Sequence, residues 1–236
     1  MIRVHILQHD DWVEPGEYLA WAERRGFPLR FTRCFALDAV PERTDAELLI
    51  VLGGVQCPAT SESECAYFHS EAEQALIRRS IAEGRMVVGA CLGAQMMGQA
   101  LGAAFERSPE REVGPVTARL TEAGRRDPLL RHFPDRFAAG AWHSYMPGLT
   151  PEAVVLAESE GCPRQIVRYA PFAYAFQAHL EFTREIVAQG LVYDAADLEE
   201  PGRFVQSPQQ LLDYDYAPMN RLLSGFLDRL VEAYEG

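Results

Sequence analysis

The chain has 236 residues, of which 48% are hydrophobic, and it carries a formal net charge of −12. This length and composition are typical of a globular protein with a sizeable core, and we expect one domain over residues 1–236. The negative charge argues against nucleic acid as a direct partner, because phosphate binding requires a basic surface. No run of about 18 apolar residues occurs, so the sequence predicts neither a membrane-spanning helix nor a membrane partner.

Five cysteines occur at irregular spacing, at positions 34, 57, 65, 91 and 162. Their number is odd and no C-x-x-C pair is present, so the pattern indicates neither a zinc site nor a disulfide framework. The N-terminal residues are too polar, and their apolar run too short, for a signal peptide. We therefore expect a reducing, cytoplasmic environment.

The first half of the chain alternates strands and helices. In chain order the patterns predict a strand, a helix, two strands and a helix over residues 2–8, 17–25, 28–35, 46–52 and 70–82. The continuous apolar run at 46–52 is typical of a central parallel strand covered on both faces. Residues 86–102 then predict a strand, a turn and a helix. Repeated strand–helix units predict an open α/β fold with a mostly parallel sheet and helices on both faces.

The second half of the chain has a different rhythm, with short strand candidates separated by turn residues. These candidates are residues 113–120, 153–157, 165–168 and 172–177. We expect them to add antiparallel strands to the sheet and to return the chain to its centre. Helical patterns follow at 183–192 and 216–234, on either side of an acidic, irregular segment at 195–208.

The strongest chemical signal is Cys91, which lies between Gly89 and Gly93 in the pattern of a nucleophile elbow. Such a nucleophile occupies a strained turn from strand to helix, where close neighbouring segments leave no room for a Cβ. At a helix N-terminus, unpaired N–H groups and the helix dipole favour a thiolate and can stabilise an oxyanion. The alternative is a buried structural cysteine on an ordinary turn.

A cysteine nucleophile needs a base, and the base needs an orienting group. Of six histidines, only His179 stands at the end of an apolar strand with a carboxylate, Glu181, close behind it. Residues two apart in an extended segment point to the same side, so both side chains can face one site. Glu181 would hold the imidazole in one tautomer. A surface strand end is the alternative for this pair alone.

Gly53-Gly54 follows the central apolar run and suits a second oxyanion donor. An elbow nucleophile commonly uses the N–H of the next residue together with one from a neighbouring loop. Glycines let backbone approach the reacting atoms closely. A plain turn is the alternative on local grounds.

Five motifs together resemble those of class I glutamine amidotransferases, most of all the free-standing, GMP-synthase-like proteins of bacteria. The motifs are Gly53-Gly54, Gly89-Ala90-Cys91-Leu92-Gly93-Ala94-Gln95, Glu112-Val113-Gly114, Trp142-His143-Ser144 and Gln177-Ala178-His179-Leu180-Glu181. The resemblance spans nearly the whole chain. It implies a flavodoxin-like α/β fold and a Cys-His-Glu triad.

By matching motif positions, the resemblance implies that Cys91 attacks the side-chain amide of glutamine. His179 would act first as base and then as acid, and Glu181 would orient it. The backbone N–H groups of Gly54 and Leu92 would hold the tetrahedral oxyanion. No metal and no organic cofactor is implied.

The same resemblance implies how glutamine is held. Gln95 and the backbone of Ser144 and Tyr145 match family positions that bind its amino and carboxylate ends. Glu112 matches a family position near the site, without an assigned role.

Three functions remain open at this point. The first is hydrolysis of glutamine, with ammonia passed to a separate synthetase or other acceptor protein, because no P-loop spacing occurs in the chain. The second is hydrolysis of γ-glutamyl amines or peptides by a similar triad. The third is a non-catalytic relative that binds a ligand or partner.

Overall fold

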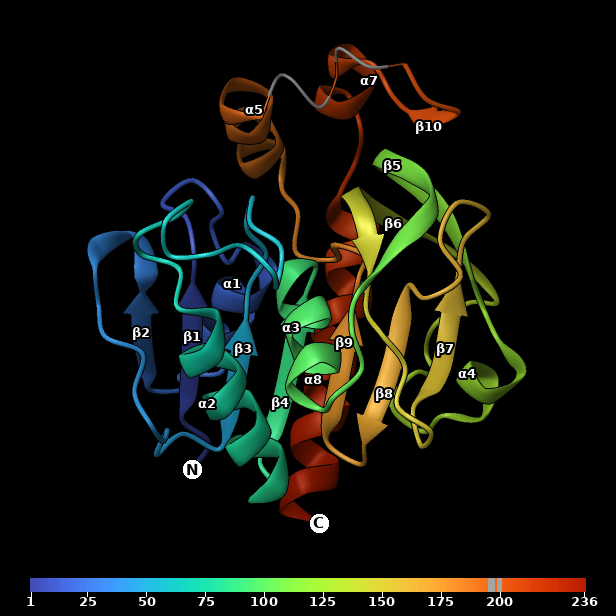
Figure 1. Cartoon of the computed structure of the whole chain (residues 1–236). Coiled ribbons are helices and arrows are strands. Elements are labelled where there is room, and N and C mark those ends of the chain that lie inside the picture. The colour runs from blue at the N-terminus through green and yellow to red at the C-terminus, as the bar shows by residue number, and fades with distance from the viewer. Residues whose placement is uncertain (195–197, 199–200) are drawn as a thin grey trace.

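The computed structural model describes residues 1–194, 198 and 201–236, and its centre is a ten-stranded mixed sheet (Figure 1). The strands are β1 (Val4–Gln8), β2 (Leu29–Arg33), β3 (Leu48–Val51), β4 (Met86–Ala90), β5 (Glu106–Leu120), β6 (Arg136–Met146), β7 (Val154–Glu158), β8 (Ile166–Ala170), β9 (Ala173–Phe176) and β10 (Phe204–Val205). They lie in the order β10-β5-β7-β8-β9-β4-β3-β1-β2, and β6 pairs with β5.

The first half of the sheet is parallel, and antiparallel strands follow in the second half. β1 pairs in parallel with β2 and β3, β3 pairs with β4, and β4 pairs with β9. The pairs β5–β6, β5–β7, β7–β8 and β8–β9 are antiparallel. Every residue of β1, β3 and β4 is buried, as expected for strands covered on both faces. The predicted α/β fold with antiparallel additions is therefore confirmed.

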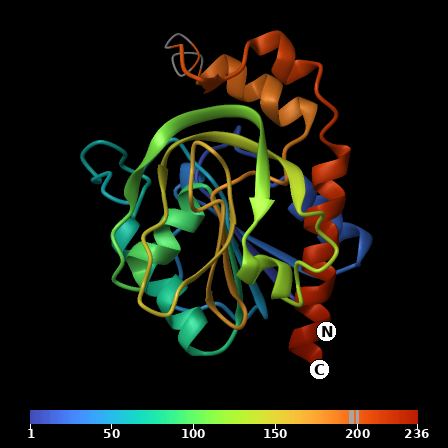
Figure 2. The same ribbon diagram turned by 90° about the vertical axis from the view of Figure 1, so that its right-hand side faces the viewer.

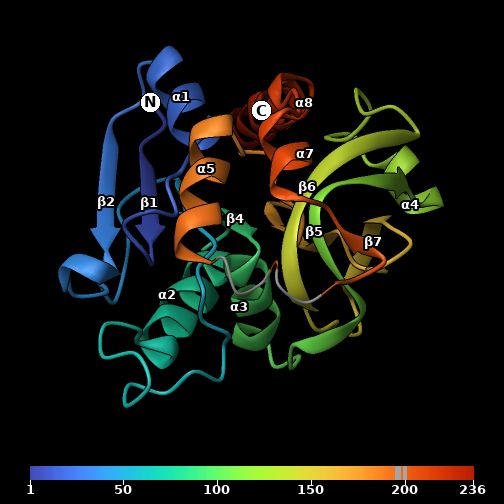
Figure 3. The ribbon, with the colours of Figure 1, turned by 90° about the horizontal axis from the view of Figure 1, so that it is seen from above.

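Helices cover both faces of this sheet (Figure 3). The helices of the described chain are α1 (Glu17–Arg24), α2 (Ser70–Ala82), α3 (Leu92–Ala100), α4 (Glu122–Arg126), α5 (Arg184–Tyr193), α7 (Pro208–Leu212) and α8 (Ala217–Glu235), with a 3-10 turn η1 (Cys34–Ala36) after β2. The amphipathic helix α8 packs with α1 on one face, where Trp21 and Phe226 belong to one core cluster. The opposite face carries α2 and α3, where Leu76 and Met96 belong to a second cluster.

The second half departs from the sequence prediction. β5 begins at Glu106, and β6 was not predicted; the two run side by side as a long curved ribbon (Figure 2). The start of β5 is rich in charged residues and β6 mixes alanine and glycine with aromatics, so neither shows a clean alternation. The predicted irregular segment 195–208 contains β10. Its residues 195–197 and 199–200 lie outside the described residues.

Among the helices that the structure describes, none combines the length and hydrophobicity needed to cross a bilayer.

The carboxyl ends of three neighbouring strands position the candidate site. Gly53 follows β3, Cys91 follows β4, and His179 follows β9. These strands are adjacent in the sheet, so the three connecting loops meet at one edge. This edge is where ligands bind in open α/β sheets. Helix α5 and helix α7 lie beyond it (Figure 1).

Candidate active site

Cys91 occupies a strained backbone conformation between β4 and α3. Its φ of 49° and ψ of −107° lie in a region that residues other than glycine rarely adopt. The Cys91 N–H donates to the carbonyl of Phe176 at 2.8 Å, which ties the turn to β9. The residue is 7% exposed, more than the buried Cys34 at 1% and Cys162 at 0%.

The glycines on either side of Cys91 are required by packing. A Cβ on Gly93 would lie 2.0 Å from the carbonyl oxygen of Val51, and one on Gly89 would lie 2.5 Å from the backbone of Gly93. Both distances are well inside van der Waals contact, so helix α3 can begin this close to the sheet only with glycine at these positions. The elbow pattern predicted from the sequence therefore has a direct steric cause.

His179 and Glu181 form a buried pair on the neighbouring loop. The imidazole Nδ1 lies 2.5 Å from Oε1 of Glu181. The ring stacks on Phe182 with centroids 4.1 Å apart, and the backbone of His179 pairs with Gly140 on β6. With Nδ1 bound to Glu181, the other ring nitrogen, Nε2, is left for the reacting groups.

The environment of His179 favours its charged form. Burial lowers the pKa of His179, but the Glu181 carboxylate and the Cys91 sulfur outweigh burial and raise that pKa to about 10. A Cβ on Gly53 would lie 3.3 Å from the His179 ring and 3.5 Å from Cβ of Cys91, so both side chains flank the same point. An imidazolium next to the sulfur attracts negative charge onto it.

The N–H groups of Gly54 and Leu92 lie near the sulfur and have no hydrogen-bond partner within the described part of the chain. The Leu92 side chain packs 3.0 Å from where a Cβ on Gly54 would stand, so the two residues are neighbours. A Cβ on Gly54 would also lie 2.5 Å from Oε1 of Gln56, so a larger residue here would displace that side chain. Two free donors beside a nucleophile are the requirement of an oxyanion hole.

A residue that the sequence analysis did not single out orients one of these donors. Nδ1 of His9 lies 2.9 Å from the carbonyl oxygen of Gly53, and Nε2 lies 2.9 Å from Glu73. Burial lowers the pKa of His9, but Glu73 and the Gly53 carbonyl outweigh burial and raise it, so both nitrogens can donate. The Gly53–Gly54 peptide is trans. Holding its carbonyl on one side therefore directs the Gly54 N–H to the other.

Cys91 and Gly54 border two cavities of different character. The first is polar, with a volume of about 210 Å³, and the residues expected to bind glutamine, Gln95, Ser144 and Tyr145, line it. Gln95 donates to Oε1 of Gln177 at 3.2 Å, which holds its amide in place. These three residues, expected from the motifs to lie in one site, line one cavity beside Cys91.

The second cavity is smaller, about 50 Å³, and mostly apolar. His179 lies in its wall together with aromatic and aliphatic side chains, namely Trp12, Val13, Trp142, Phe182, Ile186 and Val187. About 10–15 Å³ of such space admits one water molecule, so this cavity has room for a small group.

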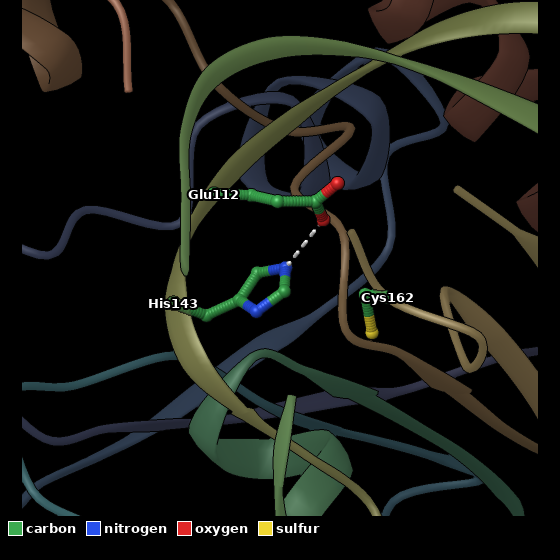
Figure 4. Close-up of side chains that lie close together, drawn as sticks. All are labelled: Glu112, His143 and Cys162. Atoms are coloured by element: carbon green, nitrogen blue, oxygen red, sulfur yellow. Dashed lines mark ion pairs between the residues drawn. The ribbon is translucent and has the colours of Figure 1, made fainter. Parts of the chain in front are cut away.

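Another Cys-His-Glu grouping lies nearby, formed by Glu112, His143 and Cys162 (Figure 4). It contains the residue types of a catalytic triad, and Nε2 of His143 is 3.3 Å from Glu112. Cys162, however, is 0% exposed, and burial raises the pKa of its thiol to about 11. A neutral, sealed thiol is a poor nucleophile, so Cys91 is the better candidate.

Comparisons with known proteins identify the family of the chain. The chain matches the family described as glutamine amidotransferase class-I over residues 23–195. It is 47% identical over 238 residues to the glutamine amidotransferase-like protein YfeJ of Salmonella typhimurium, with 99% of each chain covered.

Solved structures are similar to this chain over nearly its whole length. The crystal structure of SMU.1228c superposes with a TM-score of 0.95 at 41% identity, covering 98% of this chain and all of that one. A glutamine amido transferase from Methylobacillus flagellatus superposes with a TM-score of 0.87 at 25% identity, covering 98% of this chain and 95% of that one.

The site predicts selective alkylation. At pH 7 we expect iodoacetamide to modify Cys91 at least ~10-fold faster than Cys57 or Cys65, because imidazolium stabilises its charge. The advantage should shrink as the pH rises towards 10, where His179 loses its proton and ordinary thiols ionise. At pH 7, His179→Gln should abolish the faster alkylation of Cys91 relative to Cys57 and Cys65. Peptide mass spectrometry of timed reactions measures these rates, and equal labelling of the three thiols at pH 7 would contradict the assignment.

Proposed function

Because the chain belongs to the class I glutamine amidotransferase family, we propose that it hydrolyses the side-chain amide of glutamine to glutamate and ammonia. The observation that carries this proposal is the meeting of the strained Cys91 turn with the His179–Glu181 pair at the end of one sheet. Residues 1–236 act as one domain in this proposal, and the chemistry needs no bound metal or organic cofactor.

The first chemical step forms a thioester. The Cys91 thiolate attacks the amide carbon of glutamine, and the negative charge moves to the carbonyl oxygen. The N–H groups of Gly54 and Leu92 stabilise this oxyanion. His179 donates the proton on Nε2 to the nitrogen, the C–N bond breaks, and ammonia leaves behind a γ-glutamyl thioester.

The second step releases glutamate. Nε2 of His179, now unprotonated, takes a proton from water, and the hydroxide attacks the thioester carbon. The same two N–H groups stabilise the second oxyanion, the C–S bond breaks, and the thiolate of Cys91 is restored. Glu181 keeps Nδ1 protonated throughout, so Nε2 alone exchanges protons with the reactants.

The two cavities divide the substrate between them. The polar cavity would hold the amino acid end of glutamine at Gln95, Ser144 and Tyr145. The apolar cavity lies on the side of His179 and would receive the leaving group. Its volume of about 50 Å³ gives ammonia room to leave, as hydrolysis of glutamine requires. The acceptor of that ammonia would be a separate synthetase or another protein.

Variants of the triad test the proposal. Cys91→Ala should abolish glutamine turnover while leaving the melting temperature within a few degrees of the parent. His179→Asn should cost nearly as much activity, by a factor of at least ~10³, because triad members act as a unit. Coupled assays of glutamate and ammonia measure both products. An inactive parent chain whose Cys91 also resists glutamine-like electrophiles would instead identify a non-catalytic relative.

The position of His9 predicts a separate kinetic effect. His9→Ala should lower kcat by about tenfold to a hundredfold with little change in KM, because the Gly54 donor acts on the oxyanion rather than on the ground state. His9→Asn retains a donor near the position of Nδ1 and should recover part of kcat. If both variants instead raise KM with kcat intact, His9 does not act through the oxyanion hole.

The apolar wall of the smaller cavity favours a second candidate, a γ-glutamyl hydrolase whose leaving amine carries a small apolar group. Glutamine and the γ-glutamyl amides of methylamine, ethylamine and benzylamine discriminate the two. We expect kcat/KM to fall as the amine grows, by at least ~10-fold for benzylamine, because each added group must displace packed side chains. Turnover of the amides without turnover of glutamine would establish the hydrolase.

A further inference from the structure

Two Cys-His-Glu groupings in the described chain lie outside the catalytic residues, and they differ in how their histidine is satisfied. In the first, Sγ of Cys34 is 3.9 Å from Glu73, and His9 binds both Glu73 and the Gly53 carbonyl. Every polar atom of the His9 ring therefore has a partner. The histidine of this grouping therefore needs no further ligand.

The second grouping, Glu112, His143 and Cys162, is incomplete. Neither ring nitrogen of His143 has a hydrogen-bond partner within the described residues, although its side chain is only 1% exposed. The contact of Nε2 with Glu112 at 3.3 Å is an ion pair without hydrogen-bond geometry. A buried imidazole without partners is costly, so the arrangement calls for a ligand that the ring can bind.

Glu112 is already held in position for such a ligand. Its carboxylate accepts hydrogen bonds from Oγ of Ser159 at 2.7 Å and from Nε2 of Gln165 at 2.6 Å. The neighbouring Gly161 lets the loop pass closely, because a Cβ there would lie 2.6 Å from Oε1 of Glu112. Carboxylates and imidazoles that ligate metals are typically oriented by outer hydrogen bonds of this kind.

We propose that Glu112, His143 and Cys162 bind one zinc ion, in a site separate from the catalytic residues. Their ligand atoms all lie within 4.8 Å of one another, and the side chains come from β5, β6 and the loop between β7 and β8 (Figure 4). Tetrahedral zinc with bonds of about 2.0–2.3 Å separates its ligand atoms by roughly 3.3–3.8 Å. The nitrogen–oxygen distance of 3.3 Å fits already, and the Cys162 sulfur, within 4.8 Å of both, would move closer on binding. A water molecule would take the fourth position.

The charges of this set also suit a divalent transition metal. A thiolate and a carboxylate neutralise Zn²⁺, and neutral imidazole adds no charge, so the buried site carries no net charge. Cys162 gives up its thiol proton to solvent as the metal binds. Sulfur and nitrogen ligands favour zinc over the oxygen-seeking Mg²⁺ and Ca²⁺. The metal would join three segments, one of which, β6, reaches the polar cavity, because His143 lines it.

Zinc content tests the proposal in the full-length Cys91→Ala chain, which removes the catalytic thiol as a competing ligand. After chelator treatment, incubation with zinc and desalting, elemental analysis should find about one zinc per chain. Adding Cys162→Ser should lower the affinity at least ~100-fold, and adding Glu112→Gln should lower it at least ~10-fold. Adding Cys34→Ser is the matched control, since it removes a buried thiol from the first grouping, and should change nothing.

Cobalt provides a second readout that needs no change at the site. Co²⁺ added to the Cys91→Ala chain should give the absorption of a thiolate-bound tetrahedral ion, and zinc should displace it. Circular dichroism identifies any variant that fails to fold. The proposal is overturned if Cys91→Ala binds no zinc, if it shows no thiolate–cobalt band, or if a folded Cys162→Ser variant retains zinc.

Discussion

The close approach of helix α3 to the end of strand β3 determines where the rest of the candidate site can lie. Gly93 packs against the carbonyl of Val51, and in the turn that precedes it Cys91 adopts a positive φ. The sulfur thereby lies in the walls of the two cavities at the sheet edge, with the N-terminal N–H of Leu92 beside it. The histidine, its carboxylate and the second donor all approach from loops that end at the same edge.

The second constraint is the burial of polar side chains, and three buried histidines have three different environments. The carboxylate of Glu181 balances the imidazolium of His179, which leaves one ring nitrogen for chemistry. His9 is fully bonded and serves to hold a peptide in place. His143 has the same types of neighbour but unsatisfied nitrogens, which suits it to a metal. Similar residue sets thus have different uses because their hydrogen bonding differs.

The two cavities around Cys91 relate these constraints to substrate choice. The larger cavity has polar groups in its wall, and the smaller cavity is lined by tryptophan, phenylalanine and aliphatic side chains. A molecule with a charged amino acid end and a small neutral leaving group matches this division. Strand β6 supplies part of the wall of the polar cavity, so the antiparallel addition to the sheet contributes to this cavity as well as to the fold.

The sequence alone indicated the candidate residues, because the glycine-flanked cysteine, the His-x-Glu at a strand end and the Gly-Gly turn are short patterns along the chain. The steric reason for Gly93, its contact with Val51, lies in the tertiary structure. It also indicated the parallel half of the sheet, because short apolar runs bounded by glycine turns alternate there with helical patterns. Only the tertiary structure decided the role of His9, the existence of β6 and the meeting of Glu112, His143 and Cys162. Those features depend on contacts between residues far apart in the chain, which neither spacing nor periodicity encodes.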